Sequence, residues 1–295
     1  MNADKNKPFL IRVNPCPSVA NFCCFFLIGA AFAQQPQNPS PMVEHTRAHT
    51  RLPEETPPGK REKLELGTLF LPKSLPAHPE LLLFFHGEPW IAEVAGERNR
   101  VAVVSEVAGN GSGVYVRLFE DPQRFPKLVK EAEAKAHRRF TRVILGGWSA
   151  GCGALRQILK SPESYARVNS VICIDGMHTD YASGQPGPVE STLSEDNLRV
   201  WMQLGRDAMA GRKRFMITHS EIFPGTYAST TETADYLLTQ LHVKSRPVLK
   251  WGPMGMQQLS EASRGKFVLQ GFAGDSAPDH VDQLHSLPVW LKMLR

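Results

Sequence analysis

Residues 142–159 read RVILGGWSAGCGALRQIL, and this stretch decides the fold. Residues 142–145 have the pattern of a short buried strand, and residues 151–160 that of a helix. The turn between them, residues 147–151, is GWSAG and fits a G-x-S-x-G pattern. A tight strand-to-helix turn crowds the backbone, so the positions two before and two after the serine must be very small. The spacing predicts that Ser149 stands above a sheet as an exposed nucleophile.

Short apolar strands alternate with helices throughout most of the chain. Strands are predicted at residues 63–71, 81–85, 100–107, 142–145, 168–174, 214–218 and 267–271, and helices at 122–137, 151–160, 197–210, 230–241 and after 280. Continuous apolar strands are typical of a parallel sheet that is covered on both faces. The alternation predicts an α/β fold with a doubly wound, mostly parallel sheet.

Five side chains that can carry chemistry come just after predicted strand ends: His86, Ser149, Asp175, His219 and His280. Ligands of doubly wound sheets bind at the carboxyl ends of the strands. We therefore expect these residues to gather around one site.

Three motifs resemble the α/β-hydrolase superfamily, over about residues 63–295. LLLFFHG at 81–87 is similar to the third strand and its oxyanion turn, GWSAG to the nucleophile elbow, and PDHVDQL at 278–284 to the terminal histidine loop. The order of these residues along the chain, serine, then acid, then histidine, is also the order found in the superfamily. The resemblance implies an α/β-hydrolase fold and a serine hydrolase, similar to lipase-like and polyester-depolymerase-like esterases. It identifies no narrower family.

His280 is the expected general base. It follows the last predicted strand by a loop that can bring an imidazole over the sheet edge, and imidazole can take and return a proton near neutral pH. His285 is the alternative, but it falls in the following helix and should point elsewhere. His86 is expected to shape the oxyanion turn.

The acid of the triad is open between two residues. The commoner superfamily position, after the seventh strand, corresponds to Glu221, whereas some lipases carry the acid after the sixth strand, which corresponds to Asp175. Of the two, we expect Glu221 to contact His280, because the loop after the seventh strand lies nearer the histidine loop in most members of the superfamily.

The oxyanion hole needs two backbone donors. The resemblance assigns one to Ala150 and the other to the loop of Gly87 and Glu88, because the next residue is a proline and has no N–H. Three aromatic residues are candidate walls of a substrate-binding pocket: Trp90, Trp148 and Tyr115.

The N-terminus has the pattern of a signal peptide over residues 1–33. A basic start is followed by the apolar stretch 19–33, which ends in the A-x-A pattern of residues 31–33. Residues 34–60 are rich in Pro, Gln and charge and are expected to be a disordered linker. Residues 61–295 are expected to form the catalytic domain. The pattern predicts a secreted or periplasmic protein with no membrane span after cleavage.

Composition and motifs limit the kinds of partner and cofactor that are expected. The net charge is +5, but basic and acidic residues are interspersed, so nucleic acid is not an expected partner. Neither a nucleotide-binding G-x-x-x-x-G-K-[ST] loop nor an H-E-x-x-H metal motif occurs, and no metal or cofactor is expected. Cys152 and Cys173, the two cysteines outside the predicted signal peptide, are expected to be free, buried thiols.

Together these features predict hydrolysis of a small-molecule or polymeric ester through an acyl-enzyme. Only about twenty residues separate the sixth strand from the next helix, so no large lid domain is expected. The same triad would also serve a peptidase, a thioesterase or an acyltransferase, and some members of this fold are non-catalytic binding proteins. The sequence indicates neither the substrate's chain length nor an oligomeric state.

Overall fold

The computed structural model describes residues 47–186 and 192–295. The predicted signal peptide, residues 1–33, and the first part of the expected linker lie outside these ranges. Among the described residues, no helix has the length and apolar character needed to span a bilayer.

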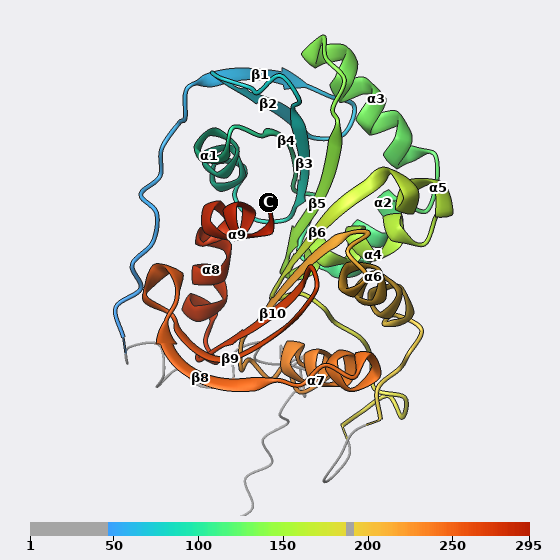
Figure 1. Cartoon of the computed structure of the whole chain (residues 1–295), viewed down its shortest axis with the longest axis vertical. Helices are drawn as coiled ribbons and strands as arrows, with labels where there is room; N and C mark the ends of the chain where they lie inside the picture. The colour runs from blue at the N-terminus through green and yellow to red at the C-terminus, as the bar shows by residue number, and fades with distance from the viewer. Residues whose placement is uncertain (1–46, 187–191) are drawn as a thin grey trace, which may run out of the picture. The chain divides into compact units, whose positions relative to one another are not determined.

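Strands and helices alternate along the described chain (Figure 1). The strands are β1 (Gly59–Lys63), β2 (Thr68–Pro72), β3 (Glu80–Phe85), β4 (Ala102–Glu106), β5 (Arg142–Trp148), β6 (Val168–Ile174), β7 (Arg214–His219), β8 (Arg246–Trp251), β9 (Gln257–Arg264) and β10 (Phe267–Phe272). The α-helices are α1 (Pro89–Asn99), α2 (Ser112–Leu118), α3 (Arg124–Ala136), α4 (Cys152–Leu159), α5 (Pro162–Arg167), α6 (Arg199–Met209), α7 (Thr230–Leu241), α8 (Ala277–His285) and α9 (Leu287–Leu294). Two short 3-10 helices are η2 (Ser149–Gly151) and η3 (Pro253–Gly255).

The strands form one sheet in the order β1-β2-β4-β3-β5-β6-β7-β10-β9-β8. The six central strands, from β4 to β10, are parallel, and antiparallel strands extend both edges. The carboxyl ends of β5, β6 and β7, which are neighbours, lie side by side. This mostly parallel, mixed α/β sheet is the predicted fold class.

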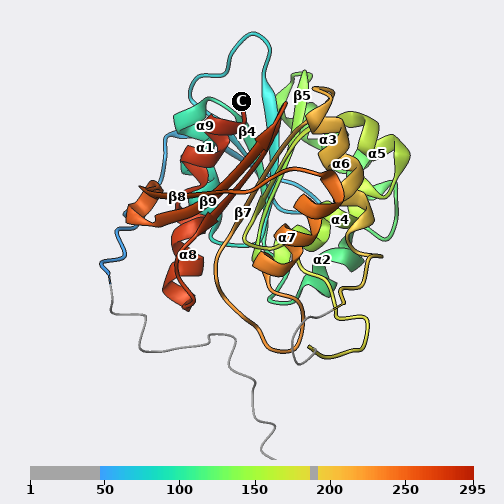
Figure 2. The same ribbon diagram turned by 60° about the horizontal axis from the view of Figure 1, so that its bottom comes forward.

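Helices cover both faces of the sheet, as Figures 1 and 2 show. On one face α1, α8 and α9 enclose a core with Phe84, Ile172 and Trp290. On the other face α2 to α7 enclose a core with Leu145 and Trp201. Burial on both faces explains why β3 and β6 are almost wholly apolar.

Most of the predicted elements are present, but the strand predicted at residues 63–71 is divided by a turn at 64–67 between β1 and β2, and the pattern missed several other elements. Helix α1 is buried along Ile91 to Gly96 and contains small residues, so its helical periodicity is hidden. Strands β8 and β9 were missed because β9 is largely polar and β8 contains a proline, and both are mostly exposed or half-buried. β9 is held in the sheet by its hydrogen bonds to β10, and β8 by its hydrogen bonds to β9, rather than by a buried apolar face.

The expectation of a disordered linker up to residue 60 is wrong for its described part. Residues 47–51 contact α8, and strand β1 begins at Gly59. Arg47 Nη2 lies 2.5 Å from Asp279 Oδ1 and 2.7 Å from Asp282 Oδ2, and Arg51 Nε donates to Asp282 Oδ1 at 3.0 Å. Composition suggested disorder because the partners of these charges lie more than 200 residues further along the chain.

Candidate active site

Ser149 occupies the strained turn that the G-x-S-x-G pattern predicts. Strand β5 ends at Trp148, Ser149 has a left-handed φ of 50°, and η2 leads directly into α4. A Cβ atom at Gly147 would lie 2.8 Å from Gly151 C, and one at Gly151 would lie 1.9 Å from Phe85 O. Neither position has room for a side chain, so both glycines are needed for this turn.

The same close approach sets the turn against the end of β3. His86 and Gly87, which follow β3, both have positive φ, at 70° and 95°. Because a Cβ atom at Gly151 would also lie 3.0 Å from His86 Cβ, the loop expected to supply an oxyanion donor passes beside the turn that carries Ser149. Ala150 is in the first turn of η2, where backbone N–H groups lack helical partners. The donor roles of Ala150, Gly87 and Glu88 stay predictions.

His280 is paired with Asp175. Its Nδ1 atom lies 2.6 Å from Asp175 Oδ2. His280 lies in the first turn of α8 rather than in the preceding loop, and a capping box between Ser276 and Asp279 starts that helix. The N–H at Nδ1 can donate to the carboxylate, which leaves Nε2 to accept a proton.

Asp175 is buried and makes four hydrogen bonds. Ser220 N and Thr230 Oγ1 donate to Oδ1 at 2.9 and 2.6 Å, while Ser220 Oγ donates to Oδ2 at 2.6 Å beside His280. Burial alone would raise the pKa of Asp175, but the charge and hydrogen bond of His280, with the two hydroxyls, hold that pKa well below its usual range. The carboxylate is therefore ionised and fixed in orientation.

Contacts of neighbouring residues link both members of this pair to the turn of Ser149. The Trp148 ring, one residue before Ser149, has its centroid 4.5 Å from that of His280, and its Nε1 donates to His280 O at 3.0 Å. Gly176, one residue after Asp175, is so close to the turn that a Cβ atom there would lie 2.3 Å from Ser149 O. The fold thus brings Ser149, His280 and Asp175 together.

The expectation that Glu221 contacts His280 is wrong. The loop after β7 does reach the histidine loop, because Glu221 N donates to Gly274 O at 2.9 Å. The exposed Glu221 side chain, however, accepts a bond from Gly274 N at 3.3 Å. Asp175 has a left-handed φ of 42° directly at the end of β6, and its carboxylate occupies the place beside the imidazole.

The three aromatic residues expected to wall a substrate-binding pocket make other contacts instead. Tyr115 is buried, and its hydroxyl lies 2.9 Å from His86 Nδ1 and accepts from Ala108 N at 3.1 Å. Trp90 packs edge-on against His285. Trp148 stacks between His86 and His280, with centroid distances of 5.1 and 4.5 Å. None of them is among the described residues that line the pocket beside Ser149.

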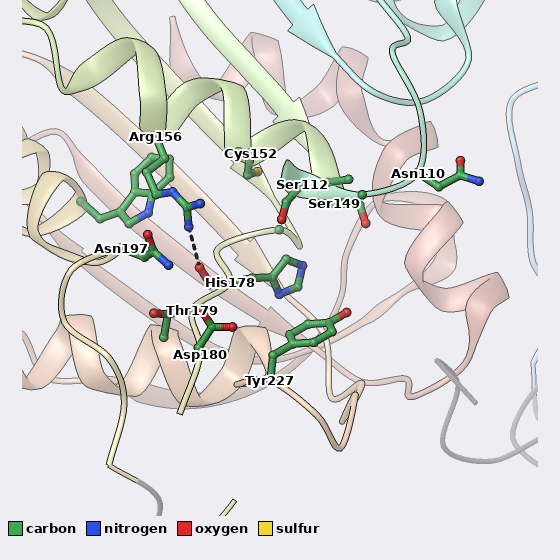
Figure 3. A pocket seen from close by; sticks show the side chains of 15 residues that line it. Asn110, Ser112, Ser149, Cys152, Arg156, His178, Thr179, Asp180, Asn197 and Tyr227 are labelled. Atoms are coloured by element: carbon green, nitrogen blue, oxygen red, sulfur yellow. Dashed lines mark hydrogen bonds between the residues drawn. The ribbon is translucent and has the colours of Figure 1, made fainter. Parts of the chain in front are cut away.

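A pocket of about 300 Å³ opens beside Ser149 (Figure 3). Polar side chains predominate among the described residues that line it, and they come from α2 and the loop before it, α4, the loop after β6 and the segments before α6 and α7. They include Asn110, Ser112, Arg156, His178, Thr179, Asp180, Asn197 and Tyr227. The volume is at the lower end for small-molecule sites.

Sequence reasoning missed these polar residues. His178 follows β6 by four positions, so the rule that ligands bind beyond strand ends would have included it. Burial lowers the pKa of His178 to about 4, although the charge of Asp175 opposes this, so the imidazole is neutral near pH 7. Arg156 is on the helix after the nucleophile turn, where side chains lean back toward the helix start.

Three groups near the N-terminal contact could in principle hold a metal ion. His49, Asp279 and Asp282 bring potential ligand atoms within 4.8 Å of one another. Both carboxylates already pair with the guanidinium of Arg47, and Arg51 adds a second cation. We therefore interpret the cluster as an ion-pair network that holds the N-terminal segment against α8.

Comparisons with known proteins identify no family. No protein-family model and no curated protein matches the chain. Similar solved structures include the poly(3-hydroxybutyrate) depolymerase LpqC from Bordetella parapertussis, at 13% identity and a TM-score of 0.45, over 76% of this chain and 84% of that chain. An acetyl xylan esterase from Aspergillus awamori has 12% identity and a TM-score of 0.43, over 75% and 93%. An esterase from Pyrobaculum calidifontis has 11% identity and a TM-score of 0.46, over 77% and 79%.

The similar structures also include an arylesterase and a monoglyceride lipase from Saccharomyces cerevisiae, with TM-scores of 0.46 and 0.42. At identities of 13% or less and TM-scores of 0.46 or less, these likenesses carry no argument, and no residue role or substrate is transferred from these proteins.

Proposed function

We propose that the protein is a serine hydrolase that cleaves carboxylic esters through an acyl-enzyme on Ser149. The observation that carries the proposal is the left-handed Ser149, on a turn that excludes side chains at both flanking glycines, beside the paired His280 and Asp175. A serine hydroxyl is a weak nucleophile unless a base can take its proton, and this arrangement supplies that base.

The reaction divides into two acyl transfers. Ser149 Oγ attacks the ester carbonyl while His280 Nε2 takes its proton, and Asp175 stabilises the imidazolium that forms. The backbone N–H of Ala150 and a donor from the loop of Gly87 and Glu88 stabilise the tetrahedral oxyanion. His280 returns the proton to the departing alcohol, and a water molecule then releases the acid by the reverse sequence.

A nucleophile test decides the proposal. A fluorophosphonate probe should label Ser149, and Ser149→Ala should lower kcat for 4-nitrophenyl butyrate by about 10⁴- to 10⁶-fold without unfolding the protein. Ser112→Ala is the matched control, because Ser112 lines the same pocket but begins α2 rather than a nucleophile turn. A Ser149→Ala variant that keeps more than a tenth of the turnover would refute the assignment.

Other acyl transfers share this chemistry. Peptides and thioesters would form the same acyl-enzyme, and an alcohol acceptor would take the acyl group from it in place of water. 4-Nitrophenyl esters, peptide anilides and acyl thioesters should therefore be compared at equal acyl length. A non-catalytic binding role is the second class of function, and it predicts no labelling of Ser149.

We also propose that the protein is exported and that cleavage follows residue 33. The support is the basic start, apolar stretch and A-x-A pattern of the sequence. Mass spectrometry of the exported protein should find Gln34 as the first residue, and a mature chain that begins at Met1 would contradict this.

A further inference from the structure

The pocket beside Ser149 contains one cationic side chain among the described residues that line it, Arg156. Arg156 is on α4, seven residues after Ser149. The Cα–Cβ bonds of a helix tilt toward its N-terminus, so this guanidinium leans back toward the turn of the nucleophile. In Figure 3 it extends from α4 toward the loop of His178, Thr179 and Asp180.

The guanidinium has donors to spare. One nitrogen, Nη1, donates to His178 O at 3.3 Å, and the buried Nε has no hydrogen-bond partner among the described residues. No carboxylate of the described residues pairs with Arg156 within 4.0 Å. A half-buried cation in this state is unfavourable, since its lost hydration is only partly replaced.

Among the described residues that line the pocket, Asp180 is the one carboxylate, and it forms no ion pair with Arg156 within 4.0 Å. His178 is neutral near pH 7, and Asn197 and Ser112 are uncharged. Asp180 is exposed at the pocket. Burial lowers the pKa of Arg156 and the charge of Asp180 raises it, but the guanidinium stays protonated at any ordinary pH. An anion that enters from solvent would therefore find a partly dehydrated cation with unused donors.

We propose that Arg156 binds a free carboxylate of the substrate, so that the preferred substrates are esters with a second, ionised carboxyl group on the acyl side. The inference rests on the proposed ester hydrolysis at Ser149. A guanidinium presents a planar fork that matches a carboxylate with two parallel hydrogen bonds, and such charge-assisted bonds are the stronger ones. The pocket's small volume favours a short spacer between the two carbonyl groups.

The covalent chemistry is that of ordinary hydrolysis. The bond between the acyl carbon and the alcohol oxygen breaks, and the elements of water are added across it. The second carboxylate is unchanged, and the products are a dicarboxylate and an alcohol. Arg156 contacts the substrate away from the bond that breaks, so it should act mainly on KM.

Two matched substrates test the proposal: 4-nitrophenyl hydrogen adipate, which is anionic, and its neutral methyl ester, methyl 4-nitrophenyl adipate. The wild-type protein should favour the anionic ester by about tenfold or more in kcat/KM, and added salt should weaken that preference. Arg156→Gln should remove the preference by raising KM for the anionic ester, and leave the neutral ester within about twofold.

Two further variants separate charge from geometry. Arg156→Lys keeps the charge but loses the fork, so it should retain only part of the preference. Asp180→Asn removes the nearby negative charge and should lower KM for the anionic ester. Monomethyl adipate, which is itself an ester of the proposed class, should compete with 4-nitrophenyl butyrate as an alternative substrate of the wild-type protein, a measurement that needs no variant to fold.

The outcomes distinguish the two proposals. If both esters are hydrolysed equally well by the wild-type protein, or if Arg156→Gln slows both alike, carboxylate recognition is refuted while ester hydrolysis stands. If neither ester is hydrolysed and Ser149 is not labelled, the proposed function fails, and this inference with it.

Discussion

Nδ1 of His280 lies 2.6 Å from Oδ2 of Asp175, two residues separated by 105 positions in the sequence. Asp175 is at the end of β6, and His280 is in the first turn of α8, on the other side of β7 and β10 in chain order. Ser220 and Thr230 hold the same carboxylate from the loop after β7 and from α7. Three segments, the end of β6, the loop after β7 and α7, therefore hold the Asp175 carboxylate in the position where it contacts the imidazole.

Substitutions of Asp175 and Glu221 should show by their effects on kcat which of the two is the acid of the triad. Asp175→Asn should lower kcat by about 10⁴-fold, because the imidazole loses the group that sets its tautomer and stabilises its charge. Glu221→Gln should change kcat by less than about threefold, since an exposed amide oxygen can still accept from Gly274 N. Steady-state kinetics with 4-nitrophenyl butyrate measures both. The reverse ranking would restore Glu221 as the acid.

Trp148 should act as a positioning residue for His280. Trp148→Phe keeps a stacked ring but removes the Nε1 bond to His280 O, so we expect kcat to fall by about tenfold with KM little changed. Trp90→Phe is the control, because Trp90 contacts His285 rather than His280. Equal losses of kcat in both variants, or a fall in thermal stability that accounts for the loss, would argue for a structural role alone.

The N-terminal contact should stabilise the fold. Asp282 is buried, and the double variant Arg47→Ala, Arg51→Ala would remove two of its cationic partners. We expect a loss of about 3 kcal/mol in the free energy of unfolding, because a buried carboxylate would lose most of its compensation. Urea denaturation measures it. Arg98→Ala, which breaks the exposed pair with Glu55, should cost less than about 1 kcal/mol. Similar losses in both would contradict this account.

His178 should make the protein less stable in mild acid. Burial lowers its pKa from 6.5 to about 4 in the folded state, so between these values the unfolded chain binds a proton that the folded chain does not. Stability should therefore fall as the pH drops from about 6.5 to about 4, by up to about 1 kcal/mol per pH unit from this residue.

The contribution of His178 is measured as a difference. Denaturation of wild type and His178→Gln at several pH values should give a shallower pH dependence for the variant. His219 and His86 also have pKa values lowered by burial and contribute in the same direction, but they are common to both proteins. The exposed His78→Gln is the control. Parallel curves for wild type and His178→Gln would exclude the effect.

The sequence by itself determined the fold class and the turn of the nucleophile. Apolar strands and intervening helices depend on local periodicity, which is visible in one sequence. The G-x-S-x-G turn is likewise local, because the contacts that require Gly147 and Gly151 arise within the turn and from the strand beside it. His280 could be proposed as the partner from its place after the last strand.

Only the tertiary structure decided which acid meets His280 and what lines the pocket. β6 and β7 are adjacent parallel strands, so their ends bring Asp175 and Glu221 to the same edge, and sequence position cannot separate them. Their side-chain directions depend on a left-handed φ at Asp175 and on hydroxyls that come from later segments. Arg156 and His178 meet through a bond between α4 and the loop after β6, and the N-terminal arginines find their carboxylates in α8. Contacts between residues so far apart in the sequence form only when the chain folds, so no local sequence pattern predicts them.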